Sequence, residues 1–433
     1  MKTITVREFA HLTIDEIREP SLDWASLSPA DFDELCALNE RRLEGEPPLL
    51  RMKGRGTLQV CNYVGVIQTS LGTRIEILPK TSEGTSAECI AQERNLLIKI
   101  LSAVFNLTCR EGETANIRRF TAPLQEWVIS RFLEELHFVF KKGLRFSYNH
   151  VAEERPFLCG RLDVGKQAVQ PPQRMHLLHI RHNIYSVDRP EHRLLRSALN
   201  RCIASTQHGE NIRLAAPLHT LFAEIQPSVC PRDDFRQWSA SRHMAHYQRI
   251  RPWCELILGT EMPFALAGEW HGISMLFPME KLFEKYVGVC LRRQLVSGAR
   301  LYEQVSRNWL CTHNQYAFFS LRPDILIKHK EKDWLLDVKW KKLSGDRSNN
   351  FGISQQDFYQ LFAYGHKYLK GEGDLALIYP LHSGFPSISE PFIFSDALRL
   401  WILPFDLNTD KVKFETSTIC FNELFRNSYF FDR

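Results

Sequence analysis

Hydrophobic and polar positions alternate along the first part of the chain, as they do in β-strands with one buried face. A helix is expected at 28–43, because Ser28 and Pro29 supply an N-cap and a first-turn proline. Gly65 lies inside one of the alternating segments and permits a kink or a bulge there. The expected strands span residues 3–9, 57–67 and 73–80. We therefore predict that residues 1–87 form a small β-rich module.

The periodicity changes to that of helices near residue 88. Apolar residues then recur every three or four positions, which places them on one face of an α-helix. Helices are expected over residues 89–107, 123–140, 189–205 and 249–258. The pattern between 207 and 277 is otherwise mixed. We predict that residues 88–274 form a mainly helical central region.

Strand and helix patterns alternate in the last third of the chain, which indicates a compact α/β unit with a C-terminal tail at residues 275–433. A helix at 278–295 comes first, and Ser354 provides the N-cap of a later helix that ends near residue 370. Between them, a charged connection at 329–333 joins two strands as a hairpin. Strands are expected at 302–309, 321–328, 334–340, 374–379, 391–394 and 398–405. The predicted fold class is multidomain α+β.

Composition indicates a folded protein without membrane spans. The 433 residues are 44% hydrophobic and 24% charged, which is ordinary for globular domains. The sequence has no long apolar run and no secretory leader, so we expect a cytoplasmic protein that does not bind membranes. The eleven cysteines occur without a C-x-x-C motif and are expected to be reduced thiols. A net charge of +5 permits a nucleic-acid partner without requiring one.

The expected hairpin carries the candidate chemistry. Asp324 stands at the head of its first strand, and Asp337 and Lys339 stand near the end of its second strand. Side chains two residues apart project on the same face of a strand, so Asp337 and Lys339 share a face, while Val338 points into the apolar packing. Antiparallel pairing is expected to bring Asp324 near this face from the neighbouring strand.

Two carboxylates that converge at the edge of an apolar sheet repel each other unless a divalent cation lies between them. Hard oxygen ligands suit Mg²⁺, with Mn²⁺ as a substitute. A lysine beside such a metal stabilises the charge that develops on a phosphate under attack, or orients the attacking water. This pattern favours a nuclease centre. The alternative is a surface hairpin whose charges are only solvated.

Residues on both sides of the hairpin extend the pattern. Glu284 lies at the margin of the apolar face of the preceding helix, and Gln360 and Tyr364 share one face of the following helix. Together with Pro323-Asp324 and Asp337-Val338-Lys339, these residues resemble the motifs of the PD-(D/E)xK nuclease superfamily. Gln360-x-x-x-Tyr364 is similar to the Q-x-x-x-Y element of its RecB-like branch.

The resemblance to this superfamily implies a role for each residue. Asp324 and Asp337 would bind Mg²⁺ with help from the carbonyl of Val338. Glu284 would complete the acidic shell directly or through water, and Lys339 would stabilise the pentavalent phosphate or orient the water. The glutamine and tyrosine of the later helix would support the metal, the lysine or a DNA phosphate.

The chain as a whole also resembles the McrC family of nuclease subunits. The similar stretches are Val64-Gly-Val, Ile75-Glu-Ile-Leu-Pro-Lys80, Cys159-Gly-Arg-Leu, Arg189-x-x-x-Arg193-Leu-Leu and Phe277-x-Met-x-x-Leu-Phe-Glu284. This resemblance implies that the chain cuts double-stranded, 5-methylcytosine-containing DNA together with a McrB-like hexameric AAA+ GTPase, whose GTP hydrolysis it stimulates. The N-terminal module resembles the part that contacts this partner. The sequence has no P-loop motif, so the chain itself is expected to bind no nucleotide.

Two other functions remain open from the sequence. The first is a non-catalytic adaptor that activates a partner GTPase through a decayed nuclease fold. Decay would usually alter Asp324, Asp337 or Lys339, and all three are intact. The second is a stand-alone DNA-repair nuclease, which would cut DNA without any GTPase.

Overall fold

The structure is a computed structural model that divides into two compact units. It describes residues 2–18, 21–40, 48–81, 84, 86–107, 123–259, 274–330, 332–414, 421 and 424–425. The first unit comprises Met1–Ile4, Gly65–Glu76 and Thr108–Leu276, and the second comprises Thr5–Val64, Ile77–Leu107 and Phe277–Arg433. Most of the N-terminal segment thus belongs to the same unit as the C-terminal segment.

The first unit is built mainly from helices. Their bounds are α4 Leu124–Lys141, α5 Val164–Ala168, α6 Pro190–Ser205, α7 Gly209–Leu221, α8 Pro231–Arg236, α9 Ala245–Gln248 and α10 Arg251–Leu258. The helices predicted at 123–140, 189–205 and 249–258 are confirmed by α4, α6 and α10. Trp127 of α4 and Trp253 of α10 are fully buried and meet edge to face, with ring centroids 5.2 Å apart. Such aromatic pairs contribute area and geometry to a core.

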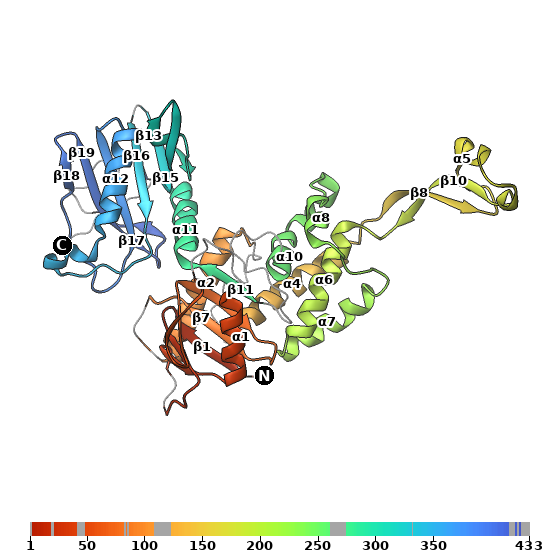
Figure 1. The fold of residues 1–433 in the computed structure, drawn as a ribbon, viewed down its shortest axis with the longest axis horizontal. Helices are drawn as coiled ribbons and strands as arrows, with labels where there is room; N and C mark the ends of the chain where they lie inside the picture. Colours follow the sequence, from red (N-terminus) through yellow and green to blue (C-terminus); the bar gives the residue numbers. More distant parts are fainter. Residues whose placement is uncertain are drawn as a thin grey trace. The chain divides into compact units, whose positions relative to one another are not determined.

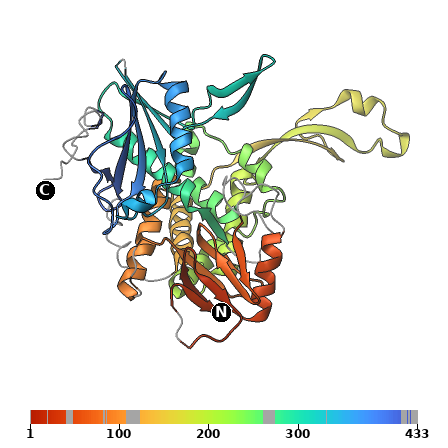
Figure 2. The same cartoon turned by 60° about the vertical axis from the view of Figure 1, so that its left-hand side comes forward.

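The central region also contains strands that the sequence pattern did not predict. Strands β8 (Ser147–Arg155) and β10 (Leu178–Ser186) pair antiparallel from Ser147↔Ser186 onward, and the short β9 (Arg161–Leu162) joins β10. We call this segment the β8–β10 arm, and it extends away from the helices of its unit (Figures 1 and 2). Most side chains of β10 are half-buried or exposed. A strand without a buried face shows no apolar alternation, which explains why the pattern gave no signal.

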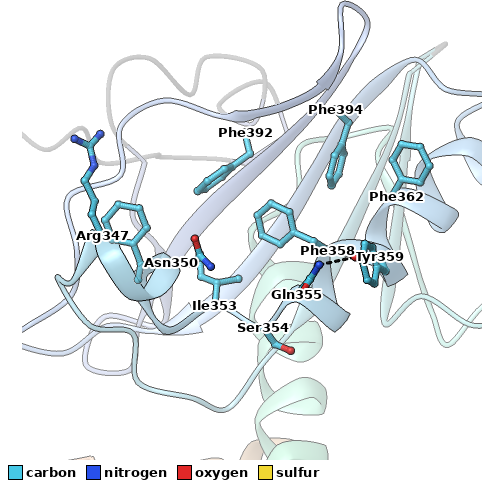
Figure 3. A pocket seen from close by; sticks show the side chains of 11 residues that line it. Arg347, Asn350, Ile353, Ser354, Gln355, Phe358, Tyr359, Phe362, Phe392 and Phe394 are labelled. Carbon is cyan, nitrogen blue, oxygen red and sulfur yellow. Dashed lines mark hydrogen bonds between the residues drawn. The ribbon is translucent and has the colours of Figure 1, made fainter.

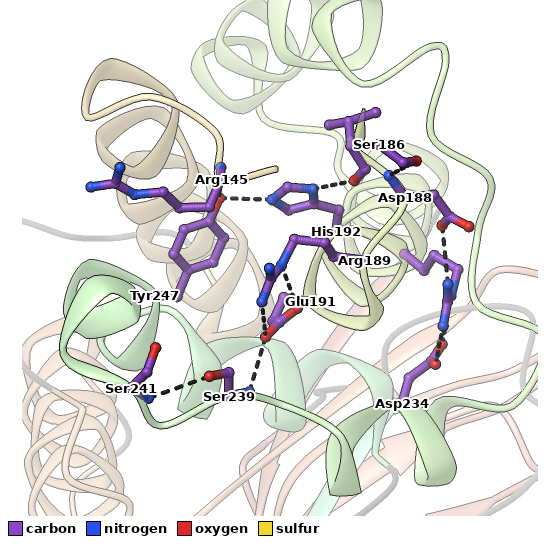
Figure 4. Close-up of polar contacts among 12 residues, drawn as sticks. Arg145, Ser186, Asp188, Arg189, Glu191, His192, Asp234, Ser239, Ser241 and Tyr247 are labelled. Carbon is purple, nitrogen blue, oxygen red and sulfur yellow. Dashed lines mark hydrogen bonds and ion pairs between the residues drawn. The ribbon is translucent and has the colours of Figure 1, made fainter. Parts of the chain in front are cut away.

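The two chain segments that join this arm to the helices, which we call its roots, are residues 145–146 and residue 187. A buried histidine–tyrosine pair fixes both roots to the helices (Figure 4). His192 Nδ1 lies 2.6 Å from the carbonyl oxygen of Val187, just after β10, and its Nε2 lies 2.7 Å from the hydroxyl of Tyr247. The same hydroxyl accepts a hydrogen bond of 3.1 Å from the backbone N–H of Arg145, just before β8. Burial lowers the pKa of His192, so the ring is neutral and Tyr247 can donate to it.

Replacing Tyr247 with phenylalanine is expected to loosen the roots of the arm. The change leaves the N–H of Arg145 and Nε2 of His192 without their partner, and an unsatisfied buried group costs about 1–3 kcal/mol. Hydrogen–deuterium exchange of the amide of Arg145 should become faster, and Tm should fall. Tyr185→Phe, on the exposed part of the arm, is the matched control. Equal exchange in Tyr247→Phe and the wild type would show that the pair does not hold the arm.

The N-terminal strands form two four-stranded sheets, one of which is completed by β11 from later in the chain. The first has the order β3-β2-β5-β4 and the second has the order β1-β7-β6-β11. The elements are β1 Thr3–Arg7, β2 His11–Thr13, β3 Trp24–Ser26, α1 Pro29–Glu40, β4 Leu50–Gly54, β5 Thr57–Val60, β6 Tyr63–Gln68, β7 Arg74–Leu78 and β11 Met275–Pro278. The β-rich character predicted for this segment is confirmed. The end of the helix predicted at 28–43 lies outside the described residues.

The strand predicted at 57–67 is wrong as a single element. It is two strands, β5 and β6, which lie in different sheets and are separated at Cys61 and Asn62. A continuous alternating pattern does not show where a chain passes from one sheet to the next. Gly65 is instead explained by a close approach, because it has φ of +130° and a Cβ there would lie 2.0 Å from the carbonyl oxygen of Met275.

The C-terminal segment of the second unit is organised around a seven-stranded mixed sheet. Six strands follow the order β12-β15-β16-β17-β19-β18, and β20 pairs with β19. The bounds are β12 Arg300–Glu303, β15 Ile325–His329, β16 Lys332–Val338, β17 Gly373–Pro380, β18 Phe392–Ser395, β19 Leu398–Asp406 and β20 Lys411–Val412. β15 and β16 are antiparallel, whereas β16–β17 and β17–β19 are parallel. The buried strand predicted at 374–379 is confirmed by β17, all but one of whose residues are buried.

Two strand predictions before the hairpin need correction. The strand predicted at 302–309 corresponds to the end of β12 and the start of β13 (Asn308–His313), and the strand predicted at 321–328 begins only at Ile325. β13 pairs with β14 (Tyr316–Leu321) in a separate two-stranded ribbon. Exposed ribbons bury no face, so their ends cannot be read from hydrophobicity.

Helices complete the second unit. They are α2 Ala87–Val104, α11 Met279–Gln294 and α12 Gln355–Tyr368. Ser354 caps α12 by accepting a hydrogen bond from the N–H of Gln356, as predicted. Leu361 and Tyr364 of α12 join the sheet residues Leu335, Leu375 and Leu377 in one buried cluster, which seats this helix against the sheet. No helix in the described parts of the chain is long and apolar enough to cross a bilayer.

Candidate functional site

The hairpin of β15 and β16 brings the two predicted carboxylates together. Ile325 pairs with Leu336, so Asp324 and Asp337 are the next residues to face each other across the antiparallel pair. The N–H of Val338 donates a 2.8 Å hydrogen bond to Asp324 Oδ2. The convergence predicted from the strand pattern is therefore present. Lys339 follows β16 and is held by its own N–H, which donates to the carbonyl oxygen of Ile378.

Asp337 lies at the buried centre of this group. Only 1% of the residue is exposed, and its Oδ2 lies 2.7 Å from Lys339 Nζ. Among the described residues, Oδ1 of Asp337 accepts no hydrogen bond. Asp357, in the first turn of α12, lies 3.9 Å from Lys339 Nζ through its Oδ1. A buried carboxylate oxygen without a donor is costly unless another group, such as a cation, satisfies it.

Gln304 links the two acidic elements of the site. Its Nε2 donates to Glu284 Oε1 of α11 and, at 3.2 Å, to Asp324 Oδ1. Its backbone N–H donates to the carbonyl oxygen of Asp324 at 2.9 Å. Gln304 has φ of +49°, a conformation that non-glycine residues adopt rarely and that often marks a functional position. The sequence gives no signal for Gln304, because a single glutamine between strands belongs to none of the motifs.

Burial raises the pKa of all three acidic residues. Burial, followed by the charges of Asp337 and Glu284, raises the pKa of Asp324 to about 8. Burial is also the main reason why the pKa of Asp337 and that of Glu284 are raised. The site therefore holds more negative charge than it can stabilise without a cation.

Lys339 is the cation that the protein itself supplies. Burial acts to lower its pKa, but the carboxylate of Asp337, assisted by Asp324 and Asp357, outweighs burial and raises it. Lys339 is therefore protonated at neutral pH. A protonated amine can donate hydrogen bonds and stabilise negative charge, but it cannot serve as a general base.

The donor set fits a divalent cation that prefers oxygen. Asp324 and Asp337 offer carboxylate oxygens, one of them without a donor, and their raised pKa values show that added positive charge would be favourable. In the described part of the chain, no group of three or more His, Cys, Asp or Glu side chains forms a metal-binding cluster. Two carboxylates would therefore have to be completed by carbonyl, water or phosphate oxygens, as is usual for Mg²⁺.

Gln360 and Tyr364 support the site from α12. Gln360 Nε2 donates to the hydroxyl of Tyr364 at 2.6 Å, and this hydroxyl donates to the carbonyl oxygen of Arg322 at 3.0 Å. Arg322 lies two residues before Asp324. The two predicted supporting residues thus fix the segment that leads into Asp324. Tyr368, one turn further on, binds the carbonyl oxygens of Val305 and Leu321 in the same way.

A cavity of about 670 Å³ opens over the carboxylates, and we call it the carboxylate cavity. It is lined on one side by Glu284, Asp324, Lys339 and Asp357, and on the other side by residues of the N-terminal module. A second cavity, of about 770 Å³, lies along the N-terminal half of α12 and is lined largely by aromatic side chains, with Arg347 at its edge (Figure 3). The carboxylate cavity is thus the one that holds the candidate chemistry.

In the protein without metal, the contribution of Asp324 to stability is expected to fall as pH rises from about 4 to about 8. The pKa of Asp324 is about 8 in the folded state, against an ordinary value of 3.8. The folded state therefore binds more protons than the unfolded state within this window, and deprotonation favours unfolding. The Tm of Asp324→Asn should therefore rise relative to that of the wild type as pH increases, measured in EDTA by differential scanning fluorimetry. Asp396→Asn, an exposed position between β18 and β19, is the control. The same pH dependence of Tm in Asp324→Asn and in the wild type would contradict the raised pKa of Asp324.

The fold and the site together define the class of protein to which this chain belongs. This is a mixed α+β protein whose central sheet presents two carboxylates and a lysine in the PD-(D/E)xK pattern, with a glutamate from the preceding helix. The family model described as "McrBC 5-methylcytosine restriction system component" matches residues 58–380. The chain therefore belongs to the McrBC 5-methylcytosine restriction system component family. No curated protein matches the sequence.

Two solved structures share the fold. A chain in the tetradecameric assembly of Thermococcus gammatolerans McrB AAA+ hexamers with bound McrC is 18% identical, with a TM-score of 0.68, over 94% of this chain and 95% of that chain. A chain in the cryo-EM structure of the Thermococcus gammatolerans McrBC complex is 20% identical, with a TM-score of 0.51, over 67% of this chain and 88% of that chain. The resemblance to McrC stated from the sequence is confirmed at the level of family and fold.

Proposed function

We propose that this chain is the Mg²⁺-dependent DNA endonuclease subunit of a McrBC-like, modification-dependent restriction system. The observation that carries the proposal is the convergence of Asp324, Asp337 and Lys339 at the ends of two interior strands of the sheet, with Asp337 buried. The family supplies the biological context, and the site supplies the chemistry. The C-terminal sheet with α11 and α12 is the restriction-endonuclease-like core.

Asp324 and Asp337 would hold Mg²⁺, or Mn²⁺ in its place, together with the carbonyl of Val338. The bound metal would supply Lewis-acid activation of the phosphodiester and of water. Glu284 would accept a hydrogen bond from a water at the edge of the acidic group, because Gln304 already directs it toward Asp324. Lys339, protonated and next to Asp337, would stabilise the negative charge that grows on the phosphate.

The structural neighbours suggest a partner for this chain. In the Thermococcus gammatolerans assembly, McrC is bound to McrB AAA+ hexamers. We infer that this chain likewise works with a McrB-like hexameric AAA+ GTPase and that the two act on double-stranded, methylated DNA. The prediction that residues 1–87 bind the partner stays a prediction.

The experiment that tests the proposal mixes the purified chain with methylated duplex DNA and Mg²⁺. Samples with and without the partner GTPase and GTP separate the three functions considered from the sequence. Cleavage only in the complete mixture supports the proposal. Cleavage by the chain alone would support a stand-alone nuclease, and stimulated GTP hydrolysis without any cleavage would support a non-catalytic adaptor.

A further inference from the structure

The N-terminal module forms one side of the carboxylate cavity, although sequence similarity connects it only with partner binding. Its residues Phe9, Arg51, Gln59 and Asn62 line the same cavity as Asp324 and Lys339. All of these residues belong to the second unit. Whatever occupies the space in front of the carboxylates must therefore also meet the N-terminal module.

Two buried contacts hold the module in this position. Glu8 is fully buried, and its Oε2 accepts hydrogen bonds from the indole N–H of Trp340 at 3.1 Å and from the N–H of Lys80 at 3.0 Å. Trp340 directly follows Lys339. The carbonyl oxygen of Asn62 accepts a hydrogen bond from the N–H of Met279, at the start of α11. The module is thus bonded to the residue that follows Lys339 and to the start of the helix that carries Glu284.

Phe9 is held toward the cavity at a conformational cost. It has φ of +66°, which is unfavourable for a bulky residue, and its side chain remains 44% exposed. Because its neighbour Glu8 is fixed by Trp340, the chain cannot relax without giving up that buried contact. An exposed aromatic ring kept in a strained conformation beside a candidate catalytic site is suited to pack against a ligand.

Arg51 supplies positive charge on the same side. It is exposed at the start of β4, and within the described residues its guanidinium forms no ion pair or hydrogen bond. Lys53 is a second exposed cation two residues further along the strand, at the irregularity between Met52 and Gly54. Asn62 adds a buried Oδ1 that has no hydrogen-bond donor among the described residues. A ligand with a regularly charged, anionic backbone fits this arrangement.

We propose that the β4 strand of the N-terminal module binds the DNA backbone next to the phosphate that is cut. In this assignment Arg51 contacts one phosphate inside the cavity, Lys53 contacts a phosphate further along, and Phe9 packs against a sugar or base between them. This assignment rests on the proposed function, because it uses DNA as the substrate. It gives the N-terminal module a substrate-binding role beyond any contact with the GTPase.

Salt dependence of DNA binding tests this assignment. Each phosphate contact contributes about −0.9 to the slope of log K against log salt concentration. With the full-length chain, a fluorescein-labelled duplex and Ca²⁺ in place of Mg²⁺, Arg51→Gln should make the slope shallower by about 0.9, and Arg51→Gln with Lys53→Gln by about 1.8. Phe9→Ala should weaken binding without changing the slope, because it removes an uncharged contact.

Arg18→Gln is the matched control, since Arg18 is an exposed cation of the same module that does not line the cavity. The assignment would be overturned if the salt slopes of Arg51→Gln and of the double variant equalled that of the wild type. It would also be overturned if the wild type bound no DNA at low salt. A loss of GTPase binding with unchanged DNA binding would also overturn it and assign β4 to the protein partner. If the slopes change as expected but the wild type never cleaves DNA, the proposed nuclease function fails while this binding surface stands.

Discussion

Asp337→Asn is expected to abolish DNA cleavage, with a loss of at least ~10²-fold in the rate, the cost of removing one preorganised electrostatic group. Asparagine keeps the shape of the side chain but removes the charge at the buried centre of the site, where Oδ2 meets Lys339 and Oδ1 has no donor among the described residues. A cation held there would lose one of its two carboxylates. The measurement is the rate of duplex cleavage in the complete mixture of chain, partner GTPase, GTP and Mg²⁺.

In the absence of metal the same substitution has two opposing effects on stability. It removes a carboxylate that burial disfavours, and it removes the partner that lies 2.7 Å from Nζ of Lys339. A cooperative melt of the variant in EDTA shows that it is folded, so that its loss of cleavage reports the loss of the carboxylate. A variant that still cuts DNA at the wild-type rate would remove Asp337 from the site.

Lys339→Gln is expected to reduce cleavage by ~10²–10³-fold while the chain continues to stimulate its partner. The lysine is protonated and paired with Asp337, so its loss removes stabilisation of the charge that develops on the phosphate. Cleavage and GTP hydrolysis should be measured in the same samples. If the chain is a nuclease subunit, Lys339→Gln loses DNA cleavage and keeps the stimulation of GTP hydrolysis.

A nearby lysine provides the control for this result. Lys341 also lines the carboxylate cavity, but its Nζ donates to the carbonyl oxygen of Gly352 rather than to a carboxylate. Lys341→Gln should change cleavage far less than Lys339→Gln does. Equal DNA protection in cells by the wild type and Lys339→Gln would instead favour the non-catalytic adaptor.

The sequence predicts the centre of the site well because its signals are local. Asp324, Asp337 and Lys339 lie on one hairpin, and the period of a strand is enough to place them on one face. The caps and apolar stripes of α11 and α12 likewise place Glu284, Gln360 and Tyr364 on the flanking helices. Only the structure shows that Gln360 and Tyr364 bind each other and the carbonyl oxygen of Arg322.

Contacts between distant segments leave no such signal. Gln304 reaches Glu284 and Asp324 from a loop after β12, and Asp357, which the pattern indicates only as a helix-capping residue, lies near Lys339. The N-terminal side of the cavity is likewise set by the bond between Glu8 and Trp340, which are more than three hundred residues apart. Hydrophobic periodicity records which face of an element is buried, not which other element covers it.

The β8–β10 arm was missed for a different physical reason. Strands that bury little apolar surface are held by backbone pairing and by polar contacts such as Arg181 with Asp163, neither of which produces a periodic pattern. The pair formed by His192 and Tyr247, which fixes its roots, depends on residues from two separate helices. Local sequence could indicate the helices but not this pairing.

The central claim is that Asp324 and Asp337 hold the divalent cation with which this chain cuts DNA. Fe²⁺ in place of Mg²⁺, with ascorbate and peroxide, cleaves a polypeptide next to the bound ion, and mass spectrometry locates the cuts. The account predicts cuts near residues 324 and 337–339 that compete with Mg²⁺ and disappear in Asp337→Asn. Cuts that fall elsewhere, or that persist unchanged in Asp337→Asn, would contradict it.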